Sequence, residues 1–376
     1  MIRILHILHS MNRGGTEAML MNYFRNIDRS HVQFDFLLTE LRKCQYEDEI
    51  EELGGRVFRV PRLSLRNPFQ YISGVRRFLN EHKEYSIVHS HTSSKSAVPL
   101  WIAKRCGVPV RVCHVHSSNS GLGFEGCLRG ILGIWLKKVA TDFFACGEGA
   151  AVCWYGGCCV EEKKVEIVHN AIDTDILRYN IDVRTKMRHK LVLGDTDFVL
   201  GMVSRFHPVK NHIFGLNLMR QLVENGIKVK LLLVGDGELR SEIEKNIAEL
   251  GIGQNVVMVG VVPDVHTYLQ AMDIVLMPSF NEGLPVSLIE TQANGLPCIV
   301  STGVPKEADV TGNVTFLPLN IEKWNDVLSS MIENGIERDY DAARKVRNAG
   351  YDITIECKKL EEWYIDKYRR INNEVI

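Results

Sequence analysis

The stretch Pro278-Ser-Phe-Asn-Glu-Gly-Leu-Pro-Val-Ser-Leu-Ile-Glu290 joins an apolar run at 273–277 to a run with helical periodicity at 286–294. A strand, a loop and a helix are predicted in that order, and such a helix start exposes free backbone N–H groups that bind anions. Glu282 and Glu290 flank this site and would repel a bare phosphate, so hydroxyl groups on either side of it suit them better. A ligand with hydroxyl groups on both sides of a phosphate bridge is a sugar nucleotide. In the alternative interpretation, both glutamates are solvated charges at a helix start, where acidic residues are favoured.

Strand-like and helix-like segments alternate on both sides of this stretch. In the first half, strands are predicted at 2–9, 32–38, 87–91, 108–116 and 142–146, with helices near 17–26, 68–82 and 97–105. After a polar region at 180–197, further strands are predicted at 198–203, 229–234, 256–259, 274–277 and 298–301. This alternation favours βα units on parallel sheets. We therefore expect an α/β fold of two Rossmann-like, doubly wound domains separated by a cleft, with ligands at the carboxyl ends of the strands.

The length and composition indicate a two-domain globular protein. A chain of 376 residues is too long for one ordinary core. We expect domains at 1–190 and 191–352, and a last helix at 353–376 that packs back on the first domain. No apolar run reaches the roughly 20 residues needed to span a bilayer. The ten cysteines lack Cys-x-x-Cys spacing, which favours free thiols in a reducing cytoplasm.

The charge is unevenly distributed along the chain. Residues 1–190 hold 27 Lys and Arg against 20 Asp and Glu, whereas the remainder holds 18 against 26. A basic half suggests an anionic partner, such as a lipid surface or a lipid-pyrophosphate acceptor. Basic and aromatic residues interleave over 59–78, which fits either an anionic membrane surface or an ordinary solvated face. Nucleic acid is not expected, because no recognition motif or aromatic-basic platform occurs.

Several motifs in order resemble the retaining glycosyltransferases of family 4, which have the GT-B fold. Glu282 and Glu290 form the E-x7-E signature of that family. The other marks span nearly the whole chain: Gly14-Gly-Thr-Glu17, His116, Arg205 with Lys210, and Val234-Gly-Asp-Gly-Glu238. The final mark, Gly303-Val-Pro-Lys-Glu307, departs from the more usual G-G-x-P-E and is similar to members that build exopolysaccharide or capsule.

The resemblance implies roles for the residues of the second half. Glu290 would accept hydrogen bonds from the ribose, and Glu282 would meet hydroxyl groups of the transferred sugar. Arg205 and Lys210 would stabilise the negative charge that develops on the departing nucleoside diphosphate, a role that suits fixed cations. The remaining residues expected to bind the donor are Gly235, Gly283, Leu284, Pro285, Val286 and Ser287.

The resemblance also implies roles for the first half. His116 would contact the donor sugar near its anomeric carbon, and it joins Arg205, Lys210 and Glu282 in the expected catalytic set. Gly15 is assigned to the donor, and the acceptor side would include Gly14, Glu17 and His91. The alternating pairs His89/His91 and His114/His116 also suggest a metal site. No neighbouring Cys or Asp completes a ligand set, and GT-B enzymes release diphosphate without metal, so we expect neither metal nor cofactor.

The function expected from this resemblance is transfer of a hexose or N-acetylhexosamine from a nucleotide sugar to a growing, lipid-linked glycan in exopolysaccharide or capsule biosynthesis. UDP is the expected nucleotide by family frequency alone, and the expected location is the cytoplasm or the inner face of the membrane. One alternative is a GT-B sugar-nucleotide epimerase, and another is a non-catalytic sugar-nucleotide-binding protein. A nicotinamide-dependent oxidoreductase is disfavoured because no G-x-G-x-x-G follows either first strand.

Overall fold

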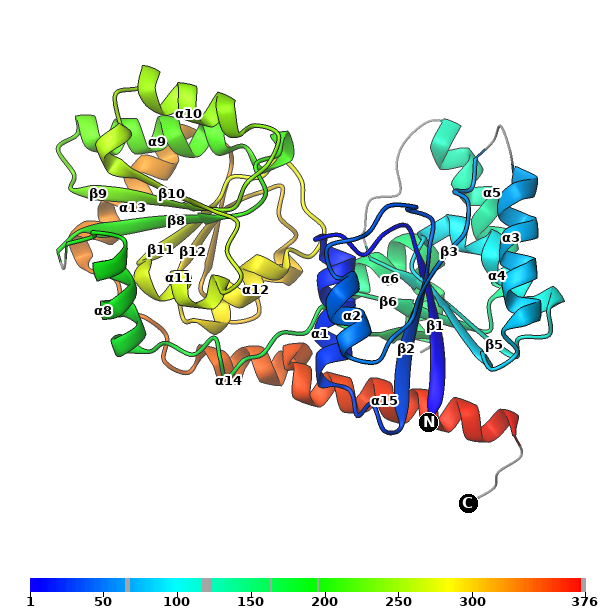
Figure 1. Ribbon diagram of the computed structural model, residues 1–376. Coiled ribbons are helices and arrows are strands. Elements are labelled where there is room, and N and C mark those ends of the chain that lie inside the picture. The colour runs from blue at the N-terminus through cyan, green and yellow to red at the C-terminus, as the bar shows by residue number, and fades with distance from the viewer. Residues whose placement is uncertain (65–67, 117–123, 163, 195, 373–376) are drawn as a thin grey trace. The chain divides into compact units, whose positions relative to one another are not determined.

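The computed structural model describes residues 1–64, 68–116, 124–162, 164–194 and 196–372. The chain divides into two compact units, which are described separately (Figure 1). The first unit comprises Met1–Ala171 and Ile353–Ile376, and the second comprises Ile172–Asp352. Among the described residues, none of the helices combines the length and the apolarity needed to cross a bilayer.

A parallel sheet forms the centre of the first unit, with the strand order β3-β2-β1-β4-β5-β6-β7. Its strands are β1 (Ile2–Leu8), β2 (Val32–Leu38), β3 (Val57–Arg59), β4 (Ile87–Ser90), β5 (Val110–Val115), β6 (Asp142–Ala145) and β7 (Val165–Ile167). All seven residues of β2 are buried, as expected for a strand covered on both faces. The register places His6 of β1 opposite His89 of β4.

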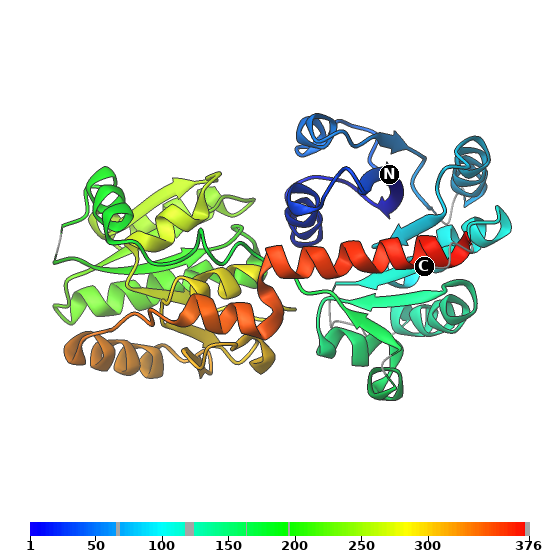
Figure 2. The same cartoon turned by 90° about the horizontal axis from the view of Figure 1, so that it is seen from below.

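The helices of the first unit connect these parallel strands and cover the sheet. They are α1 (Gly15–Asn26), α2 (Glu47–Glu52), α3 (Pro68–Glu81), η1 (Ser93–Ser96), α4 (Ala97–Arg105), α5 (Phe124–Val139), α6 (Glu148–Tyr155), α7 (Gly157–Glu161) and α15 (Ile353–Ile371). Although α15 ends the chain, it packs within the core of this unit and contacts α1 and β2. Figure 2 shows it running along the first unit. Its buried apolar side chains are Ile353, Cys357, Leu360 and Tyr364.

The second unit repeats this architecture around a parallel sheet with the strand order β10-β9-β8-β11-β12-β13. Its strands are β8 (Phe198–Val203), β9 (Val229–Val234), β10 (Val256–Gly260), β11 (Ile274–Met277), β12 (Cys298–Ser301) and β13 (Val314–Leu317). Its helices and turns are α8 (Ile181–Lys190), η2 (Pro208–Lys210), α9 (His212–Glu224), α10 (Arg240–Glu249), η3 (Gly253–Asn255), α11 (Val265–Ala271), α12 (Val286–Ala293), η4 (Lys306–Ala308), α13 (Ile321–Asn334), α14 (Ala342–Val346) and η5 (Arg347–Tyr351).

The prediction of two doubly wound parallel sheets is confirmed, and five of the ten predicted strands have the predicted bounds. Three edge strands, β3, β7 and β13, were not predicted. The compact units divide between Ala171 and Ile172, whereas the predicted first domain runs to residue 190. The intervening helix α8 is bound to the second unit by Arg184, whose guanidinium lies 2.6 Å from the carboxylate of Asp273. The cleft between the domains stays a prediction.

Candidate active site

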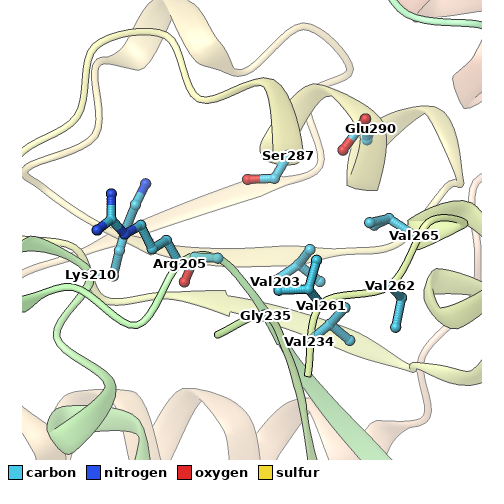
Figure 3. A pocket seen from close by; sticks show the side chains of 11 residues that line it. Val203, Arg205, Lys210, Val234, Gly235, Val261, Val262, Val265, Ser287 and Glu290 are labelled. Atoms are coloured by element: carbon cyan, nitrogen blue, oxygen red, sulfur yellow. The ribbon is translucent and has the colours of Figure 1, made fainter. Parts of the chain in front are cut away.

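A pocket of about 370 Å³ lies in the second unit, at the carboxyl ends of β8, β9 and β10 and beside the start of α12 (Figure 3). This is the edge at which parallel α/β sheets bind ligands. Figure 3 shows Arg205 and Lys210 together on one side of the pocket and Glu290 on the other. The pocket is lined by Val203, Ser204, Arg205, Lys210, Val234, Gly235, Val261, Val262, Val265, Ser287 and Glu290.

The start of α12 offers backbone N–H groups to this pocket. Pro285 precedes the helix in an extended conformation, and its side chain cannot cap the helix. The first intrahelical hydrogen bonds reach the Pro285 carbonyl from Leu288 and Ile289. Within the described residues, the N–H groups of Val286 and Ser287 therefore have no hydrogen-bonding partner. They form a helix start with free donors, as predicted, and anion binding there stays a prediction.

Lys210 and Glu282 form an ion pair at the edge of this pocket. The ammonium of Lys210 donates to the carboxylate of Glu282 at 2.6 Å, and the two side chains are only 21% and 10% exposed. Backbone bonds fix both loops: the Phe280 N–H donates to the Val209 carbonyl at 2.8 Å, and the Glu282 N–H donates to the Gly303 carbonyl at 3.0 Å. The two predicted site residues are thus adjacent, although Lys210 lines the pocket and Glu282 is not among its lining residues.

Arg205 stands on the same side of the pocket as Lys210, but its side chain is 69% exposed. Its guanidinium lies 3.0 Å from the carboxylate of Glu238, which is itself 45% exposed. An exposed ion pair of this kind contributes little to stability. Arg205 can therefore exchange Glu238 for an anionic ligand at small cost, and its planar fork suits phosphate oxygens.

Glu290 is the most unusual charged residue of the pocket. It lies one turn into α12, partly buried, and its carboxylate has no hydrogen-bond or ion-pair partner among the described residues. Burial raises the pKa of Glu290 to about 7, since the charged form loses contact with water. An unpaired carboxylate beside the aliphatic side chains of Val262 and Val265 has its acceptor oxygens available for hydroxyl groups of a ligand.

The backbone conformation at Gly235 and its close approach to Ser204 require glycine at this position. Its φ angle is +140°, and a Cβ at this position would lie 2.0 Å from the carbonyl oxygen of Ser204. Only glycine allows the backbone just after β9 to approach the backbone just after β8 this closely, at two residues that line the pocket. Gly283, Leu284, Pro285 and Val286 belong to the loop and the first turn of α12, outside the residues that line the pocket. Of these, Leu284 packs against the apolar core.

The predicted glycine-rich loop of the first unit leads into α1. Gly14 precedes the helix, and its carbonyl accepts from the Ala18 N–H at 2.8 Å. The carboxylate of Glu17 folds back over Gly14, where a Cβ would lie 2.5 Å from it. Burial raises the pKa of Glu17. A side chain at Gly15 would meet open space, so packing alone does not require glycine there.

Five histidines gather on one side of the first unit's sheet. His6 Nδ1 lies 2.9 Å from His91 Nε2, and His91 Nδ1 lies 2.9 Å from His116 Nε2. In a second series, His89 Nε2 lies 3.2 Å from His114 Nδ1. Burial lowers the pKa of all five imidazoles, that of His6 and His116 to about 3, so they are neutral at pH 7. The alternating pairs His89/His91 and His114/His116 therefore lie together in one cluster.

These histidines also approach one another as metal ligands do, since one ring nitrogen from each of His91, His114 and His116 lies within 4.8 Å of the others. Ring nitrogens of these three histidines already take part in the hydrogen bonds between imidazoles described above, so a metal ion would have to replace those bonds. The absence of a metal requirement stays a prediction.

Several residues of the pocket in the second unit and of the histidine cluster in the first unit were not predicted. His6 was missed, although it occupies an inward position of the first predicted strand. Val261, Val262 and Val265 were also missed, and the signal that points to them is their place just after the carboxyl end of β10. The structure brings Arg205, Lys210, Gly235, Ser287 and Glu290 together in one pocket. The chemical roles assigned to these residues stay predictions.

Comparison with known proteins agrees with this geometry. The model of the family "Glycosyl transferases group 1" matches residues 183–351, and the model of the family "Glycosyl transferase 4-like domain" matches residues 14–146. The putative glycosyltransferase EpsF of Bacillus subtilis (strain 168) is 36% identical over 356 residues, which cover 93% of each chain.

Two further proteins are similar over almost their whole length. The UDP-Gal:alpha-D-GlcNAc-diphosphoundecaprenol alpha-1,3-galactosyltransferase of Escherichia coli is 26% identical, with 97% of each chain covered. The crystal structure of HepE from Anabaena in complex with UDP has a TM-score of 0.77 at 17% identity, and the match covers 97% of this chain and 100% of that one. The matched family models cover both units, and the two parallel sheets agree with the fold of the similar structure. Together with the similarity to EpsF, they show that this chain belongs to the group 1 glycosyltransferases, with a glycosyl transferase 4-like domain in its first unit and the GT-B fold.

Proposed function

We propose that this glycosyltransferase moves a hexose or N-acetylhexosamine from a UDP-sugar to a growing, lipid-linked glycan in exopolysaccharide or capsule biosynthesis, with retention at the anomeric carbon. The observation that carries the proposal is the unpaired Glu290 carboxylate, in one pocket with two cations and the free N–H of Ser287. Such a pocket offers acceptors for hydroxyl groups and donors for phosphate at separate places.

The charges in the pocket suit a nucleoside diphosphate that lies along it. The diphosphate would bind near Arg205, Lys210 and the start of α12, while the ribose hydroxyls would donate to Glu290 on the other side. When the bond to the sugar breaks, negative charge develops on the diphosphate, and cations already in place stabilise it without reorganisation. Glu282, paired with Lys210, would meet the transferred sugar. The proposal includes no metal ion or cofactor.

The finer details of the substrate are supported by relatives. The name of the E. coli relative states a UDP-linked donor and a diphosphoundecaprenol-linked acceptor, and HepE was crystallised with UDP. The name of a Staphylococcus aureus relative, the capsular polysaccharide biosynthesis glycosyltransferase CapH, supports a role in capsule biosynthesis. His116, and the acceptor-side residues Gly14, Glu17 and His91, keep the roles that the family resemblance implies.

A nucleotide panel tests the proposal. The purified protein is heated with UDP, GDP, ADP or NAD, and its melting temperature is measured. We expect stabilisation by UDP of about 2.7 kcal/mol when the ligand is present at one hundred times its dissociation constant. A shift with GDP or ADP in place of UDP would keep the transferase and change the donor. No shift with any diphosphate, or a shift with NAD alone, would contradict the proposal.

Product analysis separates the transferase from its alternatives. A sugar-nucleotide epimerase would change the UDP-sugar in the absence of any acceptor, whereas a transferase requires an acceptor for sugar to appear in a new product. A non-catalytic binding protein would show the UDP shift and no turnover with either. Extracted lipid-linked glycan serves as the acceptor, and NMR of the new linkage reports whether the anomeric configuration is retained.

The lipid-linked acceptor fits a peripheral position on an anionic membrane at the cytoplasmic side. On α3, Phe69 is 78% exposed, and Arg76 and Arg77 are exposed as well. Residues 65–67 of the basic segment lie outside the described residues. Within 62–138, twelve Arg and Lys face only three Glu, a charge that complements anionic headgroups.

Neutralising Arg76 and Arg77 is therefore expected to weaken binding to vesicles of anionic phospholipid. Each basic residue near such a surface contributes about 1 kcal/mol, so Arg76→Gln/Arg77→Gln should lower the partition coefficient about 30-fold in co-sedimentation. The control Lys186→Gln/Lys228→Gln removes the same charge from exposed positions of the second unit. Equal binding of both double variants would exclude this surface.

A further inference from the structure

Three imidazoles of the first unit form an unbranched chain of hydrogen bonds. His6 lies on β1, while His91 and His116 directly follow β4 and β5. The two links, Nδ1 of His6 to Nε2 of His91 and Nδ1 of His91 to Nε2 of His116, are both 2.9 Å long. The chain ends at His6 Nε2 and His116 Nδ1, which are buried and have no hydrogen-bonding partner among the described residues.

A chain of this kind restricts the position of every proton in it. Each neutral imidazole carries one N–H and one acceptor nitrogen. If His91 donates from Nδ1, its Nε2 must accept from His6, and His116 must accept at Nε2. All three rings are then Nδ1–H tautomers, and His116 ends the chain with a free N–H. In the reverse pattern all three rings are Nε2–H tautomers, and His116 ends with a free acceptor.

The surroundings of His6 favour the first pattern. His6 is fully buried, and its ring lies 4.3 Å from the ring of Phe34 and 5.6 Å from that of Phe36, measured between centroids. The reverse pattern would leave an unpaired N–H at His6 Nε2, in this apolar environment. Both patterns leave one N–H unpaired: the first places it at His116, which is only partly buried, and the reverse places it at the fully buried His6. Because unpaired N–H groups are rare in a buried apolar environment, we assign the lone pair to His6.

We propose that His6 and His91 are positioning residues that hold His116 as its Nδ1–H tautomer, so that His116 presents a hydrogen-bond donor to an oxygen atom of the nucleotide sugar. The contact with the sugar rests on the proposed function, whereas the tautomer does not. A ring whose far nitrogen is already engaged has its proton fixed before the ligand arrives. The chain thus supplies a preorganised donor that carries no positive charge.

A second series of hydrogen bonds provides an internal reference. The Tyr364 hydroxyl lies 2.6 Å from His89 Nδ1, and His89 Nε2 lies 3.2 Å from His114 Nδ1. If Tyr364 donates, one buried N–H at His114 Nε2 remains unpaired. If Tyr364 accepts, its own hydroxyl hydrogen and the His114 acceptor are both unpaired. The first arrangement leaves fewer groups unpaired, so His89 and His114 are Nε2–H tautomers, opposite to those of His6, His91 and His116.

The tautomers are measured directly in the full-length protein labelled with 15N-histidine, by long-range 1H–15N correlation NMR at pH 7. Single His→Asn variants assign each ring. We expect His6, His91 and His116 to show the Nδ1–H pattern, and His89 and His114 to show the Nε2–H pattern. An Nε2–H pattern at His116 in the ligand-free protein overturns the proposal, whatever the panel of nucleotides shows.

Variants of His91 test whether the chain is the cause. In His91→Phe no group remains to donate to His116 Nε2, so loss of the Nδ1–H pattern at His116 is expected. In His91→Asn the side-chain amide occupies the place of Nδ1 and can still donate, so the pattern should persist. His189→Asn, which changes an exposed histidine of the second unit, is the control. An unchanged His116 in His91→Phe overturns the positioning role.

Addition of UDP-glucose, or of the UDP-sugar that turns over, then separates the two levels of the proposal. A shift of the His116 Nδ1–H signal on binding supports the contact with the donor. A persistent Nδ1–H tautomer with no shift would keep the chain and overturn the contact. Transfer activity should fall in His91→Phe and recover in His91→Asn, a rescue that a purely structural role does not give.

Discussion

Replacing Lys210 with methionine is expected to slow sugar transfer by about 10²- to 10³-fold, the usual effect of removing one group that stabilises charge in the transition state. Lys210 lines the pocket, and its ammonium lies 2.6 Å from Glu282 and is only 21% exposed. The effect should appear in kcat with little change in the KM of the donor, because the diphosphate becomes more negative only as the bond breaks. Steady-state kinetics on the identified UDP-sugar provide the measurement.

The ion pair with Glu282 complicates this substitution and also offers its control. Lys210→Met leaves a largely buried carboxylate without its partner, which should lower the free energy of unfolding by about 1–3 kcal/mol. The double variant Lys210→Met/Glu282→Gln removes both charges and should restore stability without restoring transfer. Lys228→Met, at an exposed position of the same unit, should change neither property. Wild-type turnover in Lys210→Met would contradict the assigned role.

Replacing Glu290 with glutamine is expected to weaken UDP binding by about 10- to 100-fold, since a hydrogen bond to a charged acceptor contributes about 1.5–3 kcal/mol. The substitution keeps the shape of the side chain, removes its charge and replaces one acceptor oxygen with an NH2 donor. Glu290 has no partner in the described part of the chain that this change would disturb. Isothermal titration calorimetry with UDP measures the affinity. Glu242→Gln, the same substitution at an exposed position of α10 in the second unit, is the matched control and should bind UDP with nearly wild-type affinity. Unchanged binding in Glu290→Gln would place the ribose elsewhere.

The pH dependence of Glu290 gives a second measurement on the same variant. Burial raises the pKa of Glu290 in the folded protein to about 7, from 4.5. Between these two values the folded state holds a proton that the unfolded state has released, so the free energy of unfolding falls as the pH rises toward 7. Above pH 7 both states are ionised, and the burial of the charge lowers stability. Glu290→Gln should therefore stabilise the ligand-free protein above pH 7 while weakening its affinity for UDP.

Ligand binding is expected to lower the pKa of Glu290, which burial raises in the ligand-free protein. Hydroxyl groups that donate to Glu290 favour its charged form and lower its pKa. UDP binding near pH 7 should therefore release protons, which calorimetry in buffers of different ionisation enthalpy detects. The affinity of the wild type should rise between pH 6 and pH 8, and that of Glu290→Gln should change less over the same range.

The long buried strands were predictable because their apolar runs are unbroken. β2, β8, β9, β11 and β12 have the predicted bounds. The missed strands lie at the edges of the sheets, where β3 and β7 have only three residues each and are not fully buried. Their pairing depends on the neighbouring strand and not on their own pattern, so no local signal exists for them.

The candidate site was predictable where a short motif holds the chemistry together. Glu290, Ser287, Arg205 and Lys210 were expected in one place and meet in one pocket. The pairing of Lys210 with Glu282 was not predicted, because it depends on two loops held by backbone bonds between residues far apart in the sequence. His6 was missed for a similar reason: its partner His91 is 85 positions away, and only the neighbouring positions of β1 and β4 bring them together.

The packing of α15 determines when the first unit can complete its fold during synthesis. Ile353, Cys357, Leu360 and Tyr364 belong to the same core as Ile4, from the first strand. These four side chains leave the ribosome after every residue of the second unit has been made. The second unit, which is continuous in sequence, can therefore fold on the nascent chain while the first still lacks part of its interior. The half of the protein that is synthesised first is thus the half that matures last.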